Sequence, residues 1–331
     1  MSELASKYEP DFENRIDLSV LQKKMDAVTS EVKKVIVGQD DVIRKLLIAI
    51  LAGGHSLIEG MPGVAKTLTA KLIAKSVQGD FKRIQFTPDL MPSDVTGSAI
   101  LELKSNEFQF LHGPIFGHIV LIDEINRAPA KTQSSLFECM SERQVTVDGT
   151  THPVPRPFVV FATQNPIEHE GTYRLPEAQL DRFLFKINVG YPDLEEEKEI
   201  LREHHAQKTG NKEDLVQPVV GVSELIDFQE LVKQLYVHED VFAYIVQVIF
   251  HTRSNPNLSL GASPRASIAL LEASKASAAL QGRDFITPDD VKYVAPNILG
   301  HRVLLTPEKE MEGFTSDFII KQIVDGIEIP R

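Results

Sequence analysis

The sequence predicts an α/β protein with helices on both faces of a parallel sheet, followed by a smaller all-α domain. Three observations support this prediction. Short apolar runs alternate with helical segments up to residue 190, and several are apolar throughout, as in strands buried on both faces. A glycine-containing stretch joins one of these strands to a helix. Beyond residue 205 only helical periodicity remains.

The N-terminal segment, residues 1–16, is polar and acidic, so we expect a loose tail and not a signal peptide. Apolar residues then recur at helical spacing over 17–37, which predicts one or two amphipathic helices. Asp40 and Asp41 open a further helix that we expect to reach Leu51, since acidic residues stabilise a helix N-terminus.

Five apolar runs are the predicted strands of the sheet, namely 57–58, 83–86, 118–122, 157–163 and part of 180–189. Helices are expected at 68–77 and 132–143. Because the runs alternate with helices, we expect the strands to be parallel.

Two inserted β-hairpins are predicted, at about 99–111 and 144–155. In the first, two β-like runs flank the turn-forming residues 104–106. The second has Asp148-Gly149 at its tip, the strongest short-range pattern for a hairpin.

The character of the chain changes after Tyr191-Pro192, where a charged helix is followed by a segment without a strong pattern, 209–222, expected to be a linker. Five further helices are predicted, at 222–237, 239–254, 264–280, 288–299 and 316–324. We therefore place an α/β domain at 17–205, with the two hairpins inserted in it, and a helical domain at 206–331.

Composition limits the classes of function. The 331 residues carry a net charge of −12, which argues against a surface built mainly for nucleic-acid phosphates. No apolar run reaches the roughly 20 residues needed to span a membrane. The one cysteine, Cys139, suits a reducing compartment and is expected to be a small core residue instead of a nucleophile. We expect a soluble, cytoplasmic protein.

Residues 56–67, SLIEGMPGVAKT, have the order of a phosphate-binding loop: a strand, a loop with Gly60, Pro62 and Gly63, then Lys66-Thr67 at the start of a helix. Backbone N–H groups of such a loop wrap phosphates, the lysine neutralises the β/γ oxygens and the threonine hydroxyl ligates Mg²⁺. The strict pattern has glycine where this chain has Ala65. The alternative is an ordinary glycine turn between a strand and a helix.

An acidic pair, Asp123-Glu124, ends a buried strand at the edge where α/β folds bind ligands. With the loop upstream, Asp123 would hold Mg²⁺ through water, and Glu124 would orient and deprotonate the attacking water. Alone, the pair could be an ordinary strand end followed by an acidic turn. Asn165 ends the next apolar strand and would position the same water, although asparagine before proline also commonly starts a loop.

The order of the motifs resembles that of one family. The stretches GMPGVAKT, LIDEIN, FATQNP, YRLPEAQLDRF and GASPRA are similar to those of MoxR-family AAA+ ATPases, and the resemblance covers the chain from about Val37 to its end. Ala65 also matches this family. Arg174 departs from it, because the family pattern has proline there.

The resemblance implies Mg²⁺-dependent ATP hydrolysis in a ring, normally a hexamer. It implies that Arg182 reaches the nucleotide of a neighbouring subunit and that Arg265, in the helical lid, senses nucleotide. Alternatively, Arg182 could pair with Asp181 or Glu177. Arg127 could act across the interface or form a local salt bridge. The residues expected to contact the nucleotide are Gly60, Pro62, Gly63, Val64, Ala65, Lys66, Thr67, Leu68 and Arg265, with Val37, Gly38 and Gln39 near the adenine.

Family members commonly act with proteins that carry von Willebrand factor A domains, so the resemblance implies a protein client that is remodelled or matured. The hairpins would face the pore of the ring. Two alternatives are a motor on nucleic acid and a nucleotide-gated binding module with slow hydrolysis. The mixed composition of the hairpins disfavours the motor, because strand-tracking loops need cations or stacking rings. Glu124 and Asn165 disfavour the binding module.

Overall fold

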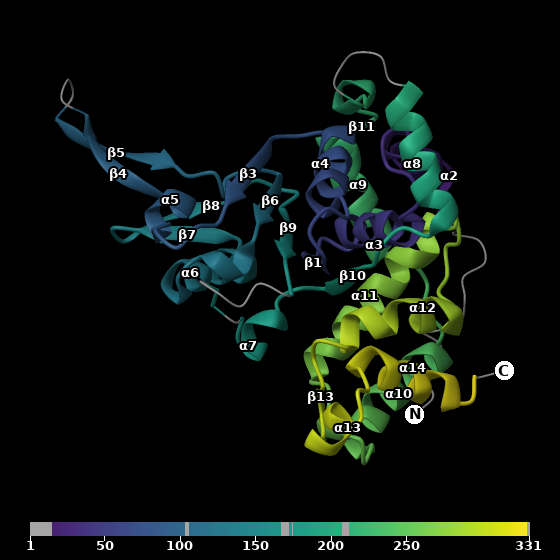
Figure 1. Ribbon diagram of the computed structural model, residues 1–331. Helices are drawn as coiled ribbons and strands as arrows, with labels where there is room; N and C mark the ends of the chain where they lie inside the picture. Colours follow the sequence, from purple (N-terminus) through teal and green to yellow (C-terminus); the bar gives the residue numbers. More distant parts are fainter. Residues whose placement is uncertain (1–14, 103–105, 167–171, 174, 207–211, 330–331) are drawn as a thin grey trace.

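A computed structural model of the chain describes residues 15–102, 106–166, 172–173, 175–206 and 212–329. A parallel sheet lies at the centre of the first half, helices of the second half pack beside it, and two hairpins project away from both (Figure 1). Most of the predicted tail, and Arg174, lie outside the described residues.

The sheet has five strands in the order β10-β1-β9-β6-β3, and all its pairings are parallel. The strands are β1 (Ser56–Gly60), β3 (Phe81–Gln85), β6 (Ile119–Asp123), β9 (Val159–Gln164) and β10 (Phe185–Val189). All five were predicted from apolar runs. Their parallel order confirms the predicted α/β class, because parallel strands need long crossovers, which helices supply here.

Two apolar clusters cover the two faces of the sheet. Alternate residues of one strand enter different clusters: Leu121 packs on one side, whereas Val120 and Ile122 pack on the other. The first cluster includes α2 (Ser19–Val32), α3 (Asp40–Leu51) and α4 (Lys66–Ser76). The second includes α6 (Ala130–Glu142). The sheet is therefore the middle layer of an α/β/α sandwich.

The first cluster continues without a break into the helical half. It includes residues of α9, α10, α11, α12 and α14. The elements of this half are α8 (Leu194–Ala206), η2 (Lys212–Leu215), β11 (Val220–Gly221), α9 (Val222–Lys233), α10 (Glu239–Ser254), β12 (Leu258–Leu260), α11 (Pro264–Leu280), α12 (Pro288–Leu299), β13 (Leu304–Leu305), α13 (Pro307–Met311) and α14 (Ser316–Gly326). The boundary at 205/206 stays a prediction, since the core crosses it.

One expectation about this half is wrong. Residues 209–222 were expected to be a linker, yet Val220 and Gly221 form β11, which pairs in parallel with β2 (Val77–Gln78). The side chain of Val220 is buried. This two-residue strand anchors the start of α9 to the α/β half, and such a short pairing leaves no periodicity in the sequence.

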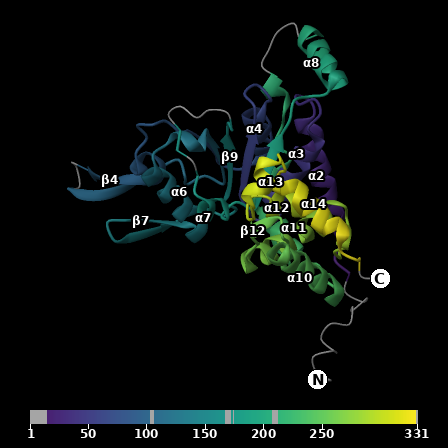
Figure 2. The same ribbon diagram turned by 60° about the horizontal axis from the view of Figure 1, so that its bottom comes forward.

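The two predicted hairpins are present and project side by side in both views (Figures 1 and 2). The first pairs β4 (Gly97–Glu102) with β5 (Glu107–His112) after the short helix α5 (Pro92–Thr96). The second pairs β7 (Gln144–Val147) with β8 (Thr150–Pro153). Its tip residues Asp148 and Gly149 both have positive φ, as the tight hairpin turn requires. The ring of Phe110 stacks on His152, 4.1 Å between centroids, and so connects the hairpins.

Among the described residues, no helix combines the length and the apolar character needed to cross a membrane. Cys139 is a buried core residue, as predicted. Burial raises the pKa of its thiol to about 12, so the thiolate that a nucleophile needs does not form at neutral pH.

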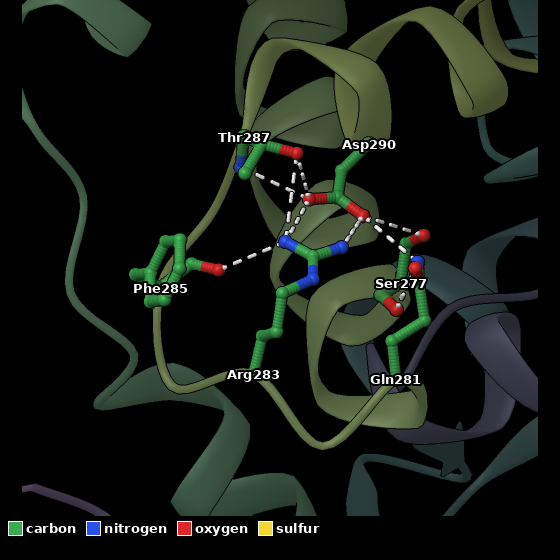
Figure 3. A network of polar contacts seen from close by, with 6 residues as sticks. All are labelled: Ser277, Gln281, Arg283, Phe285, Thr287 and Asp290. Atoms are coloured by element: carbon green, nitrogen blue, oxygen red, sulfur yellow. Dashed lines mark hydrogen bonds and ion pairs between the residues drawn. The ribbon is translucent and has the colours of Figure 1, made fainter.

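A buried ion pair closes the turn between α11 and α12 (Figure 3). The guanidinium of Arg283 donates to both oxygens of Asp290, each at 2.8 Å. Ser277 donates to the same carboxylate, as do the hydroxyl and backbone N–H of Thr287 at the start of α12. The hydrogen bonds of its own guanidinium to Asp290 raise the pKa of Arg283 above its ordinary value. Asp290 is thus both helix cap and ion-pair partner.

We expect Asp290→Ala to lower the free energy of unfolding by about 2–4 kcal/mol, because it leaves a partly buried guanidinium unpaired and removes the cap. Urea unfolding followed by circular dichroism measures this. The matched control is Asp289→Ala, since Asp289 is exposed in the same helical turn. This control should lower the free energy of unfolding by less than about 1 kcal/mol. Equal effects of the two variants would contradict the assignment.

Candidate nucleotide site

The loop between β1 and α4 has the backbone of an anion-binding turn. Gly63 and Ala65 both have positive φ, at 87° and 58°, and α4 begins directly after Ala65. The N–H groups at the start of this helix therefore face the loop, where the helix dipole favours a negative group. Gly60 is also required, because a Cβ there would lie 2.5 Å from the backbone oxygen of Val189.

Gln39, which precedes α3, forms hydrogen bonds to this loop and to α4. Its amide nitrogen donates to the backbone oxygen of Val64 at 2.9 Å, and its amide oxygen accepts from the hydroxyl of Thr69 at 2.9 Å. Gln39 thus connects the loop to the first turns of α4. The sequence placed Gln39 near the nucleotide, but its bracing contacts were not predicted.

Lys66 lies across the loop. Its ammonium donates to the backbone oxygens of Gly60 at 2.5 Å and Met61 at 2.8 Å. The ammonium is therefore held against the loop, and Lys66 lines a cavity beside it. Lysine supplies this charge as a compact point that can turn toward a phosphate oxygen.

The buried carboxylate of Asp123 connects three elements. One of its oxygens accepts from the hydroxyls of Thr67, at 2.8 Å, and Thr163, at 3.1 Å. The other accepts from Nε of Arg83 at 2.7 Å. Asp123 is 3% exposed, so these bonds satisfy a charge that burial would otherwise make costly. Thr163 and Arg83 come from the flanking strands β9 and β3, and sequence analysis missed both.

Glu124 has a left-handed backbone, with φ 56°. Its N–H donates to the Thr163 hydroxyl at 3.1 Å. Its carboxylate accepts from the Gln85 amide at 2.9 Å and pairs with Arg127 at 2.9 Å. Of the two alternatives for Arg127, this chain therefore has the local salt bridge. An uncommon backbone conformation held by neighbouring contacts is frequent at functional sites.

Three of the four predicted catalytic residues, Lys66, Glu124 and Asn165, line one cavity of about 430 Å³. Asn165 directly follows β9, is 8% exposed and lines this cavity. The other predicted site residues in its wall are Pro62, Gly63, Val64, Ala65, Lys66, Thr67, Leu68, Asp123 and Glu124. The carboxyl ends of parallel strands meet at one edge of a sheet, which explains the convergence.

A larger cavity of about 610 Å³ adjoins the first and shares Gly63, Val64, Ala65 and Leu68 with it. Val37 and Gln39, which were predicted to lie near the adenine, line this cavity. Gly38 does not line it. The lining of this cavity also includes Tyr191, Pro192 and three residues of α8, namely Ile200, Leu201 and His204. These lining residues were not predicted, because the sequence indicated only a charged surface helix at α8. His204 is nevertheless exposed, as expected.

Arg182 and Arg265 line neither cavity. Arg182 precedes β10, whereas the phosphate loop follows β1, and these neighbouring strands are parallel, with Phe185 opposite Ser56. A strand of this length separates the two ends by roughly 13 Å. Arg182 forms no ion pair with Asp181 or Glu177 among the described residues. That alternative is not found.

Arg265 lies at the same end of the sheet as Arg182, with its Nε 3.8 Å from the Asp181 carboxylate. The expected contact of Arg265 with nucleotide is therefore not present within one chain, because the lid places the side chain at the opposite edge of the sheet. Its role as a sensor remains a prediction for an assembly.

The donors beside the phosphate loop fit a magnesium ion. Thr67 and Asp123 offer hard oxygen ligands 2.8 Å apart at the cavity wall, and Mg²⁺ in nucleotide sites takes one or two protein ligands, with water and phosphate oxygens completing its shell. Within the described ranges, no cluster of three or more histidine, cysteine or acidic side chains offers another metal site.

The left-handed backbone of Ala65 gives a first test of the loop. We expect the free energy of unfolding of Ala65→Gly to lie within about 1 kcal/mol of that of the parent. Glycine relieves the backbone strain, but this gain is offset by the entropy that glycine adds to the unfolded chain. Ala65→Val should be less stable than Ala65→Gly by about 1 kcal/mol or more, since a β-branched residue is an outlier there. Urea unfolding and titration with a fluorescent ATP analogue measure both effects. Equal stability and affinity of the two variants would refute the strained geometry.

Comparison with known proteins gives consistent matches. The model of the ATPase family associated with various cellular activities (AAA) matches residues 55–185, and that of the AAA lid domain matches 250–323. The chain is 46% identical to the Bacillus subtilis protein YeaC, over 94% of this chain and 96% of that protein. It is 44% identical to the Mycobacterium tuberculosis protein named Chaperone MoxR1, over 91% of this chain and 81% of that one.

A solved structure of a candidate ATPase from Cytophaga hutchinsonii superposes with a TM-score of 0.85 at 43% identity, covering 94% of this chain and 96% of that chain. These matches extend over the α/β half and the helical half together. Residues 250–323 of the helical half therefore form an AAA lid domain.

Proposed function

Since the chain belongs to the MoxR family of AAA+ ATPases, we propose that it is an Mg²⁺-dependent ATPase that forms a ring and remodels or matures protein partners. One observation carries the proposal. Lys66, Thr67, Asp123, Glu124 and Asn165 line a single cavity at the carboxyl edge of the sheet. This is the set of groups that ATP hydrolysis needs: a phosphate cradle, a charge, metal ligands, a base and a water-positioning amide.

In the proposed mechanism, the carboxylate of Glu124 accepts a proton from a water molecule that the amide of Asn165 positions. The water oxygen forms a bond to the γ-phosphorus, the bond from that phosphorus to the bridging oxygen breaks, and ADP leaves with the electron pair. Lys66 turns from the loop carbonyls to the β/γ oxygens and neutralises the charge that develops. Gln85 and Arg127 orient Glu124 through the contacts described above.

Thr67, and Asp123 through water, would hold the magnesium ion, which when bound supplies positive charge at the β- and γ-phosphate oxygens. Thr163 and Arg83 keep the Asp123 carboxylate in place. The adenine would occupy the larger cavity, between Val37 and the wall formed by Tyr191 and α8.

The position of Arg182 supports a ring. Arg182 and Arg265 lie at the edge of the sheet opposite the phosphate loop, as the parallel register requires. Arg182 thus cannot complete the site of its own chain, but it can complete that of an adjoining subunit if copies pack one edge against the other. We propose a closed ring, normally of six subunits, in which each interface contains one complete site.

The hairpins are the proposed contact with the client. Phe108 and Leu111 of the first hairpin are 76% and 59% exposed, which suits binding of an apolar protein segment. A close relative carries the name Chaperone MoxR1. We propose a protein client in the cytoplasm, of which a protein with a von Willebrand factor A domain is one candidate. Stimulation of turnover by DNA, and not by protein clients, would overturn this choice.

We expect Glu124→Gln to retain ATP binding but to lower turnover by about 100-fold or more, because the general base is lost while the phosphate cradle stays. Phosphate release and ATP-analogue titration measure the two quantities. Lys66→Ala is the control, since it should lose binding itself. Unchanged turnover in Glu124→Gln would contradict the mechanism and favour a nucleotide-gated binding module.

We expect Arg182→Ala to lower turnover of the assembled protein by about 1000-fold or more, because transition-state charge loses its partner. The affinity of isolated subunits for ATP should stay near that of the parent, since Arg182 does not line their cavities. Single-turnover hydrolysis and equilibrium binding separate the two effects. Normal hydrolysis by Arg182→Ala would exclude the assignment across the interface.

A further inference from the structure

The guanidinium of Arg302, 4% exposed, is buried beside the segment that carries Arg182. Its Nε donates to the Asp181 carboxylate at 2.6 Å, and one terminal nitrogen donates to the backbone oxygens of Asp181, at 3.2 Å, and Phe183, at 2.6 Å. The other donates to the backbone oxygens of Leu184 and Ile298. One side chain therefore binds the backbone on both sides of Arg182.

Arg302 also belongs to the lid. It follows α12, and its bond to the Ile298 oxygen at 2.5 Å attaches the guanidinium to the last turn of that helix. The neighbouring His301 contacts the Phe183 oxygen as well, at 3.1 Å. The loop before β10 is thus bound to the lid by two adjacent side chains.

Arg265 also lies beside Asp181, the residue that accepts from Arg302. The Asp181 oxygen that does not accept from Arg302 lies 3.8 Å from Nε of Arg265. Asp181 therefore lies between Arg302 and Arg265. Burial lowers the pKa of Arg302, while its bond to Asp181 opposes this shift, and arginine starts so high that it stays charged.

We propose that Arg302 is a positioning residue for ATP hydrolysis: it fixes the loop that presents Arg182 to the adjoining subunit and makes that position depend on the lid. The inference rests on the proposed function, since it needs Arg182 to act across an interface. A fork with five donors fixes backbone geometry more strictly than a point charge. Small displacements of a catalytic group lower rates by about 100-fold, so loss of this fork should be visible in turnover.

Complementation in mixed rings separates positioning from a folding defect. An Arg302→Met subunit has an intact cavity but a misplaced Arg182, whereas a Glu124→Gln subunit has no base but a correctly placed Arg182. Rings of Arg302→Met alone should lose about 100-fold in turnover, with ATP binding by subunits unchanged. Mixing the two variants before assembly should restore activity, because Glu124→Gln supplies Arg182 to the Arg302→Met cavity.

Two controls accompany this experiment. Arg283→Met removes a partly buried guanidinium from the Asp290 pair elsewhere in the lid (Figure 3), and rings of this variant should keep their turnover. Arg302→Lys keeps a charge near Asp181 without the fork, so it should fold and show the same dependence on mixing. If Arg302→Met fails to assemble, Arg302→Lys decides the outcome.

The outcomes distinguish the two proposals. If Arg182→Ala is rescued by Glu124→Gln but neither Arg302 variant is, Arg302 is a structural residue and this inference is wrong, while the proposed function stands. If Arg182→Ala is not rescued either, the assignment across the interface fails and the inference fails with it. Both proposals are supported if mixing with Glu124→Gln restores the turnover of the Arg182 and Arg302 variants while the turnover of Arg283→Met does not depend on mixing.

Discussion

The carboxylate of Asp123 is the group on which the arrangement of the site depends. It is buried, so its charge needs partners, and it takes them from α4, β9 and β3 through Thr67, Thr163 and Arg83. The phosphate loop is thereby fixed to the sheet at its helical end, while Gln39 fixes it from outside. Thr163 also accepts from the N–H of Glu124, so the proposed metal ligand and the proposed base are both held by Thr163.

A second constraint follows from the parallel sheet. Everything that ends a strand lies at one edge, and everything that precedes a strand lies at the other. The first edge carries the phosphate loop and the proposed base, and the second carries Arg182 and Arg265, with Asp181 between Arg265 and Arg302. The fold therefore places the proposed arginines away from the phosphate loop of their own chain, and in the proposed ring the packing of one copy on another brings the two groups together.

The strands of the sheet, and the residues that follow them, could be predicted from local sequence patterns. The strands follow from apolar runs, and the convergence of Asp123 and Asn165 follows from their place at strand ends. Thr163 and Gln85 could not be identified, because their partners depend on the order β9-β6-β3, which depends on packing across the whole sheet. The location of Arg265 was missed for a similar reason: the lid orientation is set by a core that spans both halves.

The most direct measurement is a structure of the assembled protein with Mg²⁺, ADP and aluminium fluoride, a mimic of the γ-phosphate in transfer. We expect the fluoride to lie within about 3 Å of the Arg182 guanidinium of the adjoining subunit. Lys66 and Asn165 of the first subunit should face the same group, and the metal should lie beside Thr67. A fluoride contacted by residues of one chain alone, with Arg182 turned to solvent, would contradict the proposed site between subunits.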